Sequence, residues 1–239
     1  MPDNRNLAAM RAYYERGQEE ARLADGAAGQ LEFERTKEIV LRDLPPAPAL
    51  VADIGGGPGR YTHWLAGLGY QVAHRDLMPL HVAQVDRDRA ADAHIDSAVA
   101  DARDLDLAGA SVDAVLLLGP LYHLPEREER LAALREARRV VRPGGAVVVA
   151  TINRFAGLHD TIRQGVFFEG PERRALIEAA AADGVNRISE RQMFTTAYFH
   201  QPECVVEELT EAGLQLVAGS VAQLTEGAPR TTLVTMGCT

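Results

Sequence analysis

The stretch VADIGGGPGR, residues 51–60, decides the fold. Small and apolar residues lead into Asp53 and Ile54, and four of the next five residues are glycine. A short apolar run that ends in glycines is typical of a buried strand followed by a tight turn into a helix. Because glycine loses more conformational freedom on folding than any other residue, so many glycines indicate a backbone that approaches a ligand closely. The stretch therefore predicts a strand, a ligand-binding turn and a helix whose N-terminus faces the ligand.

Apolar runs and amphipathic segments alternate on the C-terminal side of this turn. The spacing predicts a mostly parallel sheet with right-handed helical crossovers. The expected strands are residues 49–54, 70–76, 95–101, 111–119 and 146–152, and the expected helices are 60–69, 79–93 and 126–141. A last helix over 202–213 precedes strands at 214–222 and 231–237, which we expect to pair as an antiparallel hairpin because the loop between them is short.

Two further segments flank or interrupt this pattern. Residues 1–44 have apolar residues at helical spacing on either side of an expected loop at 24–30, and they predict a helical lid on a main domain that spans 45–239. Within that domain the alternation breaks at residues 152–200, which hold six of the thirteen aromatic residues. We expect this insertion to cap the carboxyl edge of the sheet, where open α/β sheets bind ligands. The alternative is an ordinary insertion with a small core of its own.

Composition excludes several classes of protein. The net charge is −9, which argues against a broad surface that binds nucleic acid, and the arginines near residue 138 suit a solvated helix face. Only two cysteines are present, without the spacing of a metal site or a disulfide framework, so we expect a reduced, cytoplasmic setting. Residues 1–20 lack the apolar core of a signal peptide, and no apolar run is long enough to span a bilayer.

The spacing of the glycines narrows the ligand. A dinucleotide-binding turn has the pattern G-x-G-x-x-G, but here Gly55, Gly57 and Gly59 form G-x-G-x-G, and Arg60 stands where the third glycine is expected. A nicotinamide-dependent dehydrogenase is therefore a poor fit. The pattern of a P-loop is absent from the sequence as well.

Three carboxylates follow expected strands and add chemistry to this edge. Asp53 precedes the turn, where a carboxylate would repel pyrophosphate and attract a cationic amino-acid group. Asp76 ends the second strand, where an acid can accept from both hydroxyls of a ribose, although it also suits a helix N-cap. Asp101 follows the third strand and can accept from an exocyclic amino group, or it is a turn residue.

These features occur in a recognisable order. DIGGGPG, Asp76, AVADARDL, VDAVLLLGPLYHL and VRPGG resemble, in register through residues 50–151, the class I S-adenosylmethionine-dependent methyltransferases. YYERGQEEARL and LEFERT resemble the N-terminal lid of bacterial small-molecule members. The resemblance implies a Rossmann-like α/β fold with a seven-stranded, mostly parallel sheet and an antiparallel last strand.

The resemblance also implies a cofactor site for S-adenosyl-L-methionine, with S-adenosyl-L-homocysteine as product. Gly55, Gly57 and Gly59 would wrap the methionine part with Asp53 behind them, and Asp76 would hold the ribose. The other residues carried over are Leu77 and Met78 beside the adenine, Asp101 and Ala102 at its amino edge, Leu118 and Gly119 near the sulfonium, and Tyr14 closing over the cofactor. Leu118 also suits plain core packing.

Catalysis is less constrained by the sequence, because the sulfonium is already an excellent leaving group and alignment is the main requirement. Tyr122 and His123 follow the fourth strand, where nucleic-acid amino-methyltransferases of this superfamily carry an Asn/Asp-Pro-Pro-aromatic motif that is missing here. His123 is the first candidate for a general base and His200 the second, although both also suit a structural role. We expect no metal ion, since no carboxylate cluster can be assembled around the site.

We expect a small organic acceptor, because the aromatic residues of 152–200 can line an apolar pocket. Two alternatives are a methyltransferase that acts on a protein or another macromolecule, and a member that binds the cofactor without transferring the methyl group. The identity of the accepting atom stays open. A homodimer is a further expectation, for which the sequence names no interface residue.

Overall fold

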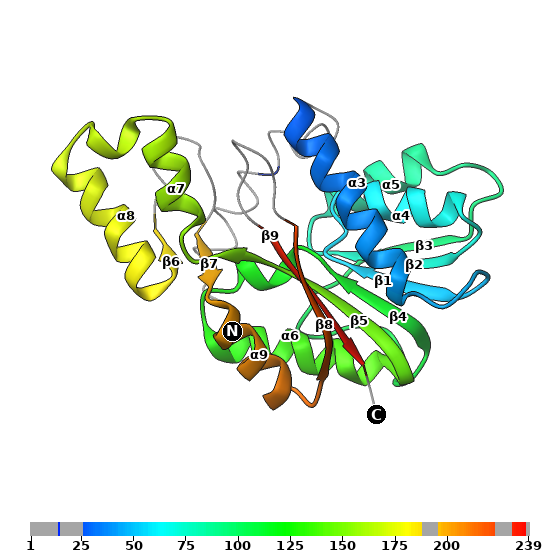
Figure 1. The fold of residues 1–239 in the computed structure, drawn as a ribbon. Helices are drawn as coiled ribbons and strands as arrows, with labels where there is room; N and C mark the ends of the chain where they lie inside the picture. The colour runs from blue at the N-terminus through cyan, green and yellow to red at the C-terminus, as the bar shows by residue number, and fades with distance from the viewer. Residues whose placement is uncertain (1–13, 15–25, 188–195, 223–230, 238–239) are drawn as a thin grey trace.

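The computed structural model describes Tyr14 and residues 26–187, 196–222 and 231–237. Its centre is a sheet in the spatial order β3-β2-β1-β4-β5, in which all neighbouring strands are parallel (Figure 1). These strands are β1 (Leu50–Ile54), β2 (Gln71–Asp76), β3 (Ile95–Val99), β4 (Val112–Leu117) and β5 (Val141–Asn153). The predicted parallel sheet is confirmed.

The expected antiparallel hairpin is also confirmed. Strand β8 (Gln215–Ala222) pairs antiparallel with β9 (Thr231–Gly237), and β9 pairs antiparallel with β5. These two strands complete the seven-stranded sheet and give it the reversed strand that we expected. Two short strands are added to it among the described residues, β6 (Val185–Asn186) and β7 (Ala197–His200), of which β7 joins β5 at Ile152 and Asn153.

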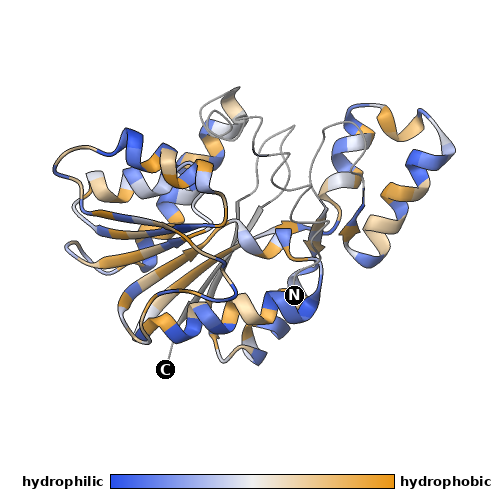
Figure 2. Ribbon diagram, turned by 180° about the vertical axis from the view of Figure 1, so that it is seen from behind, coloured by the Kyte–Doolittle hydropathy of each residue, from blue (hydrophilic) through white to orange (hydrophobic). Residues whose placement is uncertain are grey.

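Helices cover both faces of the sheet, because the central strands are apolar on both sides. Alternate residues of β4 belong to two different cores: Val115 and Leu117 pack on one face, and Ala114 and Leu116 on the other. Figure 2 shows the hydrophobic residues concentrated along the strands, whereas the helices carry both kinds of residue. One face packs against α6 (Arg127–Val140) and α9 (Pro202–Glu211), the other against α3 (Gly26–Asp43), α4 (Arg60–Gly67) and α5 (Pro79–Asp88).

Two local expectations need correction. Residues 26–30, expected in a loop, form the first turns of α3. The small and polar residues there extend a helix that is held in place because its Phe33, Ile39 and Val40 side chains are buried against the sheet. The RPGG segment, expected as a turn before the fifth strand, lies within β5 as a bulge. Val112 pairs with Val141 but Ala114 with Ala146, so the extra residues of β5 loop out of the ladder.

The insertion between β5 and α9 contains α7 (Ala156–Arg163), the 3-10 turn η2 (Val166–Phe168), α8 (Pro171–Asp183), β6 and β7. In Figure 1 its helices stand beside the carboxyl end of β5, on the opposite side of the view from α3, α4 and α5. The domain limits 1–44, 45–239 and 152–200 stay predictions. No helix of the described part of the chain is both long and apolar enough to cross a membrane.

Candidate active site

The glycine turn after β1 packs tightly against other residues at Gly55 and Gly59, but not at Gly57. A Cβ on Gly55 would lie 2.6 Å from Pro120, and a Cβ on Gly59 would lie 2.4 Å from Val85, so side chains are excluded at both positions. Gly57 differs: its φ of +58° favours glycine, yet no heavy atom of the described residues lies within 4 Å of its Cβ position. As far as the described residues go, the backbone at Gly57 therefore borders open space above the carboxyl ends of the strands.

Asp53 lies directly behind this turn. Its side chain is buried and accepts a hydrogen bond from the Thr62 hydroxyl at 2.7 Å, and a Cβ on Gly56 would lie 2.6 Å from its Oδ2. Burial raises the pKa of Asp53, and nearby His74 and the Thr62 hydroxyl offset this only in part. The carboxylate therefore braces the turn from beneath instead of facing solvent.

Asp76, at the end of β2, connects the glycine turn to α5. Its Oδ2 accepts from the Gly57 N–H at 2.8 Å, and its Oδ1 accepts from the Met78 N–H at 2.8 Å and lies 2.9 Å from Nδ1 of His81. Burial alone would raise the pKa of Asp76, but these contacts, His81 first, lower it below its usual range. The ionised carboxylate is thus held at the edge of the sheet beside Gly57.

The two residues after Asp76 differ in exposure, and the segment after β3 has a partner of its own. Leu77 is partly exposed, whereas the Met78 side chain is buried. Both carboxylate oxygens of Asp101 accept from Arg103, at 2.9 and 2.5 Å, and Arg103 also bonds Glu129. Burial opposes ionisation of Asp101, but Arg103 lowers its pKa overall. Asp101 is therefore already engaged, and Ala102 lies partly exposed next to it.

The end of β4 brings the acceptor-side candidates next to the glycine turn. A Cβ on Gly119 would lie 3.1 Å from the Gly55 carbonyl oxygen and 3.7 Å from the Tyr122 hydroxyl, so these segments are in close contact. Leu118 and Gly119 are partly exposed and lead into the 3-10 turn η1 (Pro120–His123). The Tyr122 and His123 rings lie 4.7 Å apart.

Tyr14 joins the two sides of this edge. Its hydroxyl lies 2.7 Å from Nε2 of His123, and its ring meets the ring of His81 edge-on at 5.1 Å. Since His81 contacts Asp76, one aromatic side chain of the N-terminal segment spans from the end of β2 to the end of β4. The residues around Tyr14 in sequence lie outside the described part of the chain.

His200 does not join this group. It ends β7 and its side chain is 1 % exposed. Its Nε2 lies 3.4 Å from Oε2 of Glu208 on α9, and burial lowers the pKa of His200 although Glu208 opposes the shift. The Tyr122 side chain, next to His123, packs against a hydrophobic cluster formed by Ile152, Ala156, Ala197 and Phe199.

Sequence reasoning missed the partners that hold the predicted carboxylates: His81 on Asp76, Arg103 on Asp101, and Thr62 with His74 around Asp53. Arg103 follows Asp101 by two residues and His81 follows Asp76 by five, so local spacing was the available signal. Within the described ranges, no three His, Cys, Asp or Glu residues form a group that could hold a metal ion.

Residues 52–149 match a family model described as "Methyltransferase domain". A ubiquinone biosynthesis O-methyltransferase from Xanthomonas axonopodis pv. citri (strain 306) is 35 % identical over 121 residues, which are 49 % of this chain and 48 % of that protein. The chain therefore spans about half the length of this curated relative.

Solved structures extend the likeness to nearly the whole chain. Magnesium protoporphyrin IX methyltransferase (ChlM) from Synechocystis PCC 6803, with bound SAH, has a TM-score of 0.71 and 16 % identity, with 98 % of this chain and 100 % of that chain covered. The 1,6-didemethyltoxoflavin-N1-methyltransferase of Burkholderia thailandensis has a TM-score of 0.65 and 18 % identity, with 100 % and 91 % covered. At these identities the structures show the fold. The match over residues 52–149 identifies that part of the chain as a methyltransferase domain.

Proposed function

We propose that the protein transfers a methyl group from S-adenosyl-L-methionine to a small organic acceptor. The observation that carries the proposal is the span of Tyr14 from His81, which contacts Asp76, to His123. A cofactor-side carboxylate and an acceptor-side imidazole thus meet at one sheet edge, beside the open backbone position at Gly57. Ligands in open α/β sheets bind at this edge.

The residues present fit the cofactor. The open space at Gly57 leaves room against the backbone, and the N-terminus of α4 follows at Arg60. A carboxylate that accepts three hydrogen bonds retains lone-pair capacity for a ribose hydroxyl at Asp76. When bound, the cofactor supplies a methyl group on a sulfonium, which is an activated leaving group.

On the cofactor side we assign the residues as follows. The main chain of the glycine turn holds the methionine part, with Asp53 bracing the turn, and Asp76 holds the ribose. Leu77, with Met78 behind it, borders the adenine, and Ala102 lies at the amino edge together with Asp101, which Arg103 orients.

On the acceptor side, Leu118 and Gly119 lie near the reacting methyl group, and Tyr122 and His123 face the acceptor. We place the proton acceptor at His123 instead of His200. His123 is partly exposed, and its Nε2 lies 2.7 Å from the Tyr14 hydroxyl at the sheet edge, where the acceptor binds in this proposal. His200 is almost fully buried, so we assign it no contact with the acceptor.

A small acceptor is supported by the names of similar proteins, which refer to ubiquinone biosynthesis, magnesium protoporphyrin IX and 1,6-didemethyltoxoflavin. Among the described residues of the site, none distinguishes transfer to oxygen from transfer to nitrogen or carbon.

The test is methyl transfer from methyl-labelled S-adenosylmethionine into fractions of a cell extract, with S-adenosylhomocysteine binding measured by calorimetry in parallel. Label in a low-molecular-weight product supports the proposal, and label in protein or nucleic acid contradicts the acceptor class. Binding without any label would favour a non-transferring member of the family. Loss of binding would contradict the cofactor site.

Substitution of the proposed base sharpens the test. His123→Ala should lower the rate by about 100-fold or more, the usual size of a general-base contribution. His94→Ala, at an exposed histidine before β3, is the matched control and should leave the rate unchanged. Equal rates for wild type and His123→Ala would show that the acceptor needs no proton removal by His123.

A further inference from the structure

Arg130 of α6 is buried and carries an unusual set of contacts. Its side chain is 3 % exposed. Nε and Nη2 form a fork onto the Glu208 carboxylate, with a shortest separation of 2.7 Å. Nη1 donates to the carbonyl oxygens of Leu124 at 3.0 Å and Pro125 at 2.7 Å. Four of the five guanidinium N–H groups are therefore used, half of them on the two residues that follow His123.

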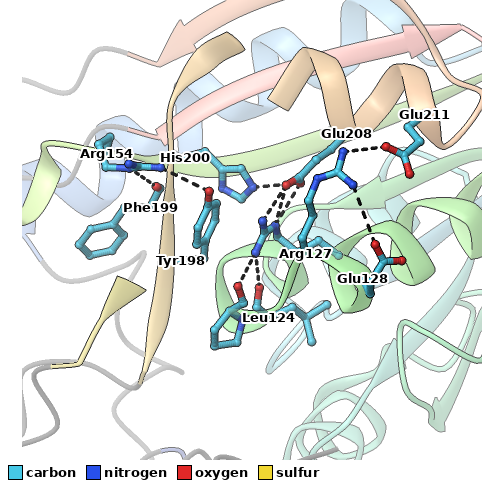
Figure 3. Close-up of polar contacts among 11 residues, drawn as sticks. Leu124, Arg127, Glu128, Arg154, Tyr198, Phe199, His200, Glu208 and Glu211 are labelled. Carbon is cyan, nitrogen blue, oxygen red and sulfur yellow. Dashed lines mark hydrogen bonds and ion pairs between the residues drawn. The ribbon is translucent and has the colours of Figure 1, made fainter. Parts of the chain in front are cut away.

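The same guanidinium stacks on the insertion. Its carbon lies 3.6 Å from the centroid of the Tyr198 ring on β7. The Tyr198 hydroxyl accepts from Arg154 at 3.3 Å, and Arg154 also donates to the carbonyl oxygens of Phe199 and Ala182. This set of contacts runs from Leu124 through Tyr198 to Arg154, and Figure 3 shows its hydrogen bonds at Leu124, at Glu208 and between Arg154 and Tyr198. It links α6, α9, β7 and the end of α8 to the η1 segment.

Stability alone does not account for a buried ion pair of this kind. Removing two charges from water costs about as much as their attraction returns, and well-packed apolar residues often serve equally well. Apolar residues cannot donate hydrogen bonds to the two part-buried carbonyl groups of Leu124 and Pro125 and so cannot hold them in place. The planar fork of arginine does both, because its donors are fixed relative to each other. These contacts therefore fix the position of the main chain directly after His123.

We propose that Arg130 is a positioning residue for methyl transfer: by its bonds to the Leu124 and Pro125 carbonyls it holds Tyr122 and His123 against β7 and α9, and so sets the place of the base relative to the acceptor. This inference rests on the proposed function. Arg130 acts through the main chain of the loop and touches neither the cofactor nor the acceptor.

The first variant is Arg130→Met, which removes all of these hydrogen bonds. The second is Arg130→Lys, which keeps a positive charge opposite Glu208 but lacks the planar guanidinium fork. Arg127→Met is the matched control, because Arg127 pairs with Glu211 at 2.7 Å between the same two helices but is exposed at the surface. If Arg130→Met does not fold, Arg130→Lys carries the test alone. Folding is followed by circular dichroism.

The kinetic readout is a double-mutant cycle with His123→Ala. Arg130→Met should leave S-adenosylhomocysteine affinity within about twofold and lower kcat by roughly 10-fold to 100-fold, the effect of a base displaced by about 1 Å. In the His123→Ala background, Arg130→Met should lower kcat by less than about threefold, because Arg130 acts through His123 and the two residues form a unit. Independent, multiplying losses would overturn the proposal, as would an equal loss of kcat in Arg127→Met.

A second readout needs no acceptor and separates this inference from the proposed function. In protein labelled with ¹⁵N-histidine, the His123 resonances, assigned with His123→Ala, should shift in Arg130→Met and Arg130→Lys but not in Arg127→Met. If wild type binds S-adenosylhomocysteine and transfers no methyl group, the proposed function fails and this shift alone decides the positioning role. Unchanged His123 resonances in both Arg130 variants would overturn it.

Discussion

The two halves of the sheet edge are held together in different ways. On the proposed cofactor side, the contacts join residues near each other in the chain: Gly57 to Asp76, Asp76 to His81, and Asp101 to Arg103. On the proposed acceptor side, Arg130 reaches Glu208 across 78 residues and Arg154 reaches Tyr198 across 44. The proposed cofactor side is built from the ends of neighbouring strands and the segments that follow them, whereas the proposed acceptor side depends on elements that only the whole fold brings together.

The largest expected effect lies on the acceptor side. The pKa of Glu208 is lowered to about 2, because contacts with His200 and Arg130 outweigh the effect of burial, which would raise it. A carboxyl group with a depressed folded-state pKa stabilises the fold above its unfolded pKa, and that stabilisation is lost as the pH falls through the folded value. Glu208→Gln should therefore cost about 3 kcal/mol at pH 7 and flatten the decline of stability between about pH 5 and pH 2.

Urea unfolding across this pH range measures the effect. Glu211→Gln is the control, since Glu211 pairs with Arg127 on the same helices but at the surface. A Glu208→Gln curve that runs parallel to the wild-type curve from pH 5 to pH 2 would contradict the assignment. Such a result would also remove the contrast between the two halves, because the acceptor side would then not depend on this buried charge.

The next effect lies on the cofactor side. Asp76→Ala leaves the N–H groups of Gly57 and Met78 and the ring of His81 without their acceptor. Unpaired buried donors cost about 1–3 kcal/mol each, so the thermal midpoint should drop. Because the ribose would lose the Asp76 carboxylate as well, S-adenosylhomocysteine affinity should fall by at least about 10-fold. Calorimetry and thermal unfolding measure the two effects, with Asp92→Ala at an exposed position as control. Unchanged affinity would place the ribose elsewhere.

A smaller effect isolates the open space at Gly57. Gly57→Ala and Gly144→Ala both force alanine to a positive φ, +58° and +79°, with no described atom within 4 Å of the new Cβ. Both should lose about 1 kcal/mol of stability from backbone strain. Only Gly57→Ala should weaken S-adenosylhomocysteine binding, by about 10-fold. Equal binding by the two variants would show that the backbone at Gly57 does not approach the cofactor.

The smallest effect tests the residue that joins the halves. Tyr14→Phe keeps the ring against His81 and loses the hydroxyl at His123. One hydrogen bond contributes about 1 kcal/mol, so the methyl-transfer rate should change by about fivefold while S-adenosylhomocysteine affinity stays within about twofold. Tyr14→Ala should lower that affinity too. A larger change in affinity for Tyr14→Phe than for Tyr14→Ala would contradict the bridging role.

The sequence by itself determined the parallel sheet, the reversed hairpin and the glycine turn. Each depends on residues a few positions apart: an apolar run followed by glycines, a carboxylate at a strand end, a short loop between two strands. The same short range explains why the end of β2, with Asp76 beside the turn, could be anticipated. The helical start of α3 could not, because residues 26–30 are small and polar and continue a helix that distant core contacts stabilise.

Only the tertiary structure decided how the two histidine candidates differ. His123 and His200 each follow aromatic residues near a strand end, and the sequence offers no period or spacing that separates them. Burial separates them: α9 places Glu208 beside His200, and β7 carries that histidine into the interior, while Tyr14 meets His123 at the sheet edge. Burial and long-range pairing are properties of the packed chain, because they depend on which distant elements come to lie together.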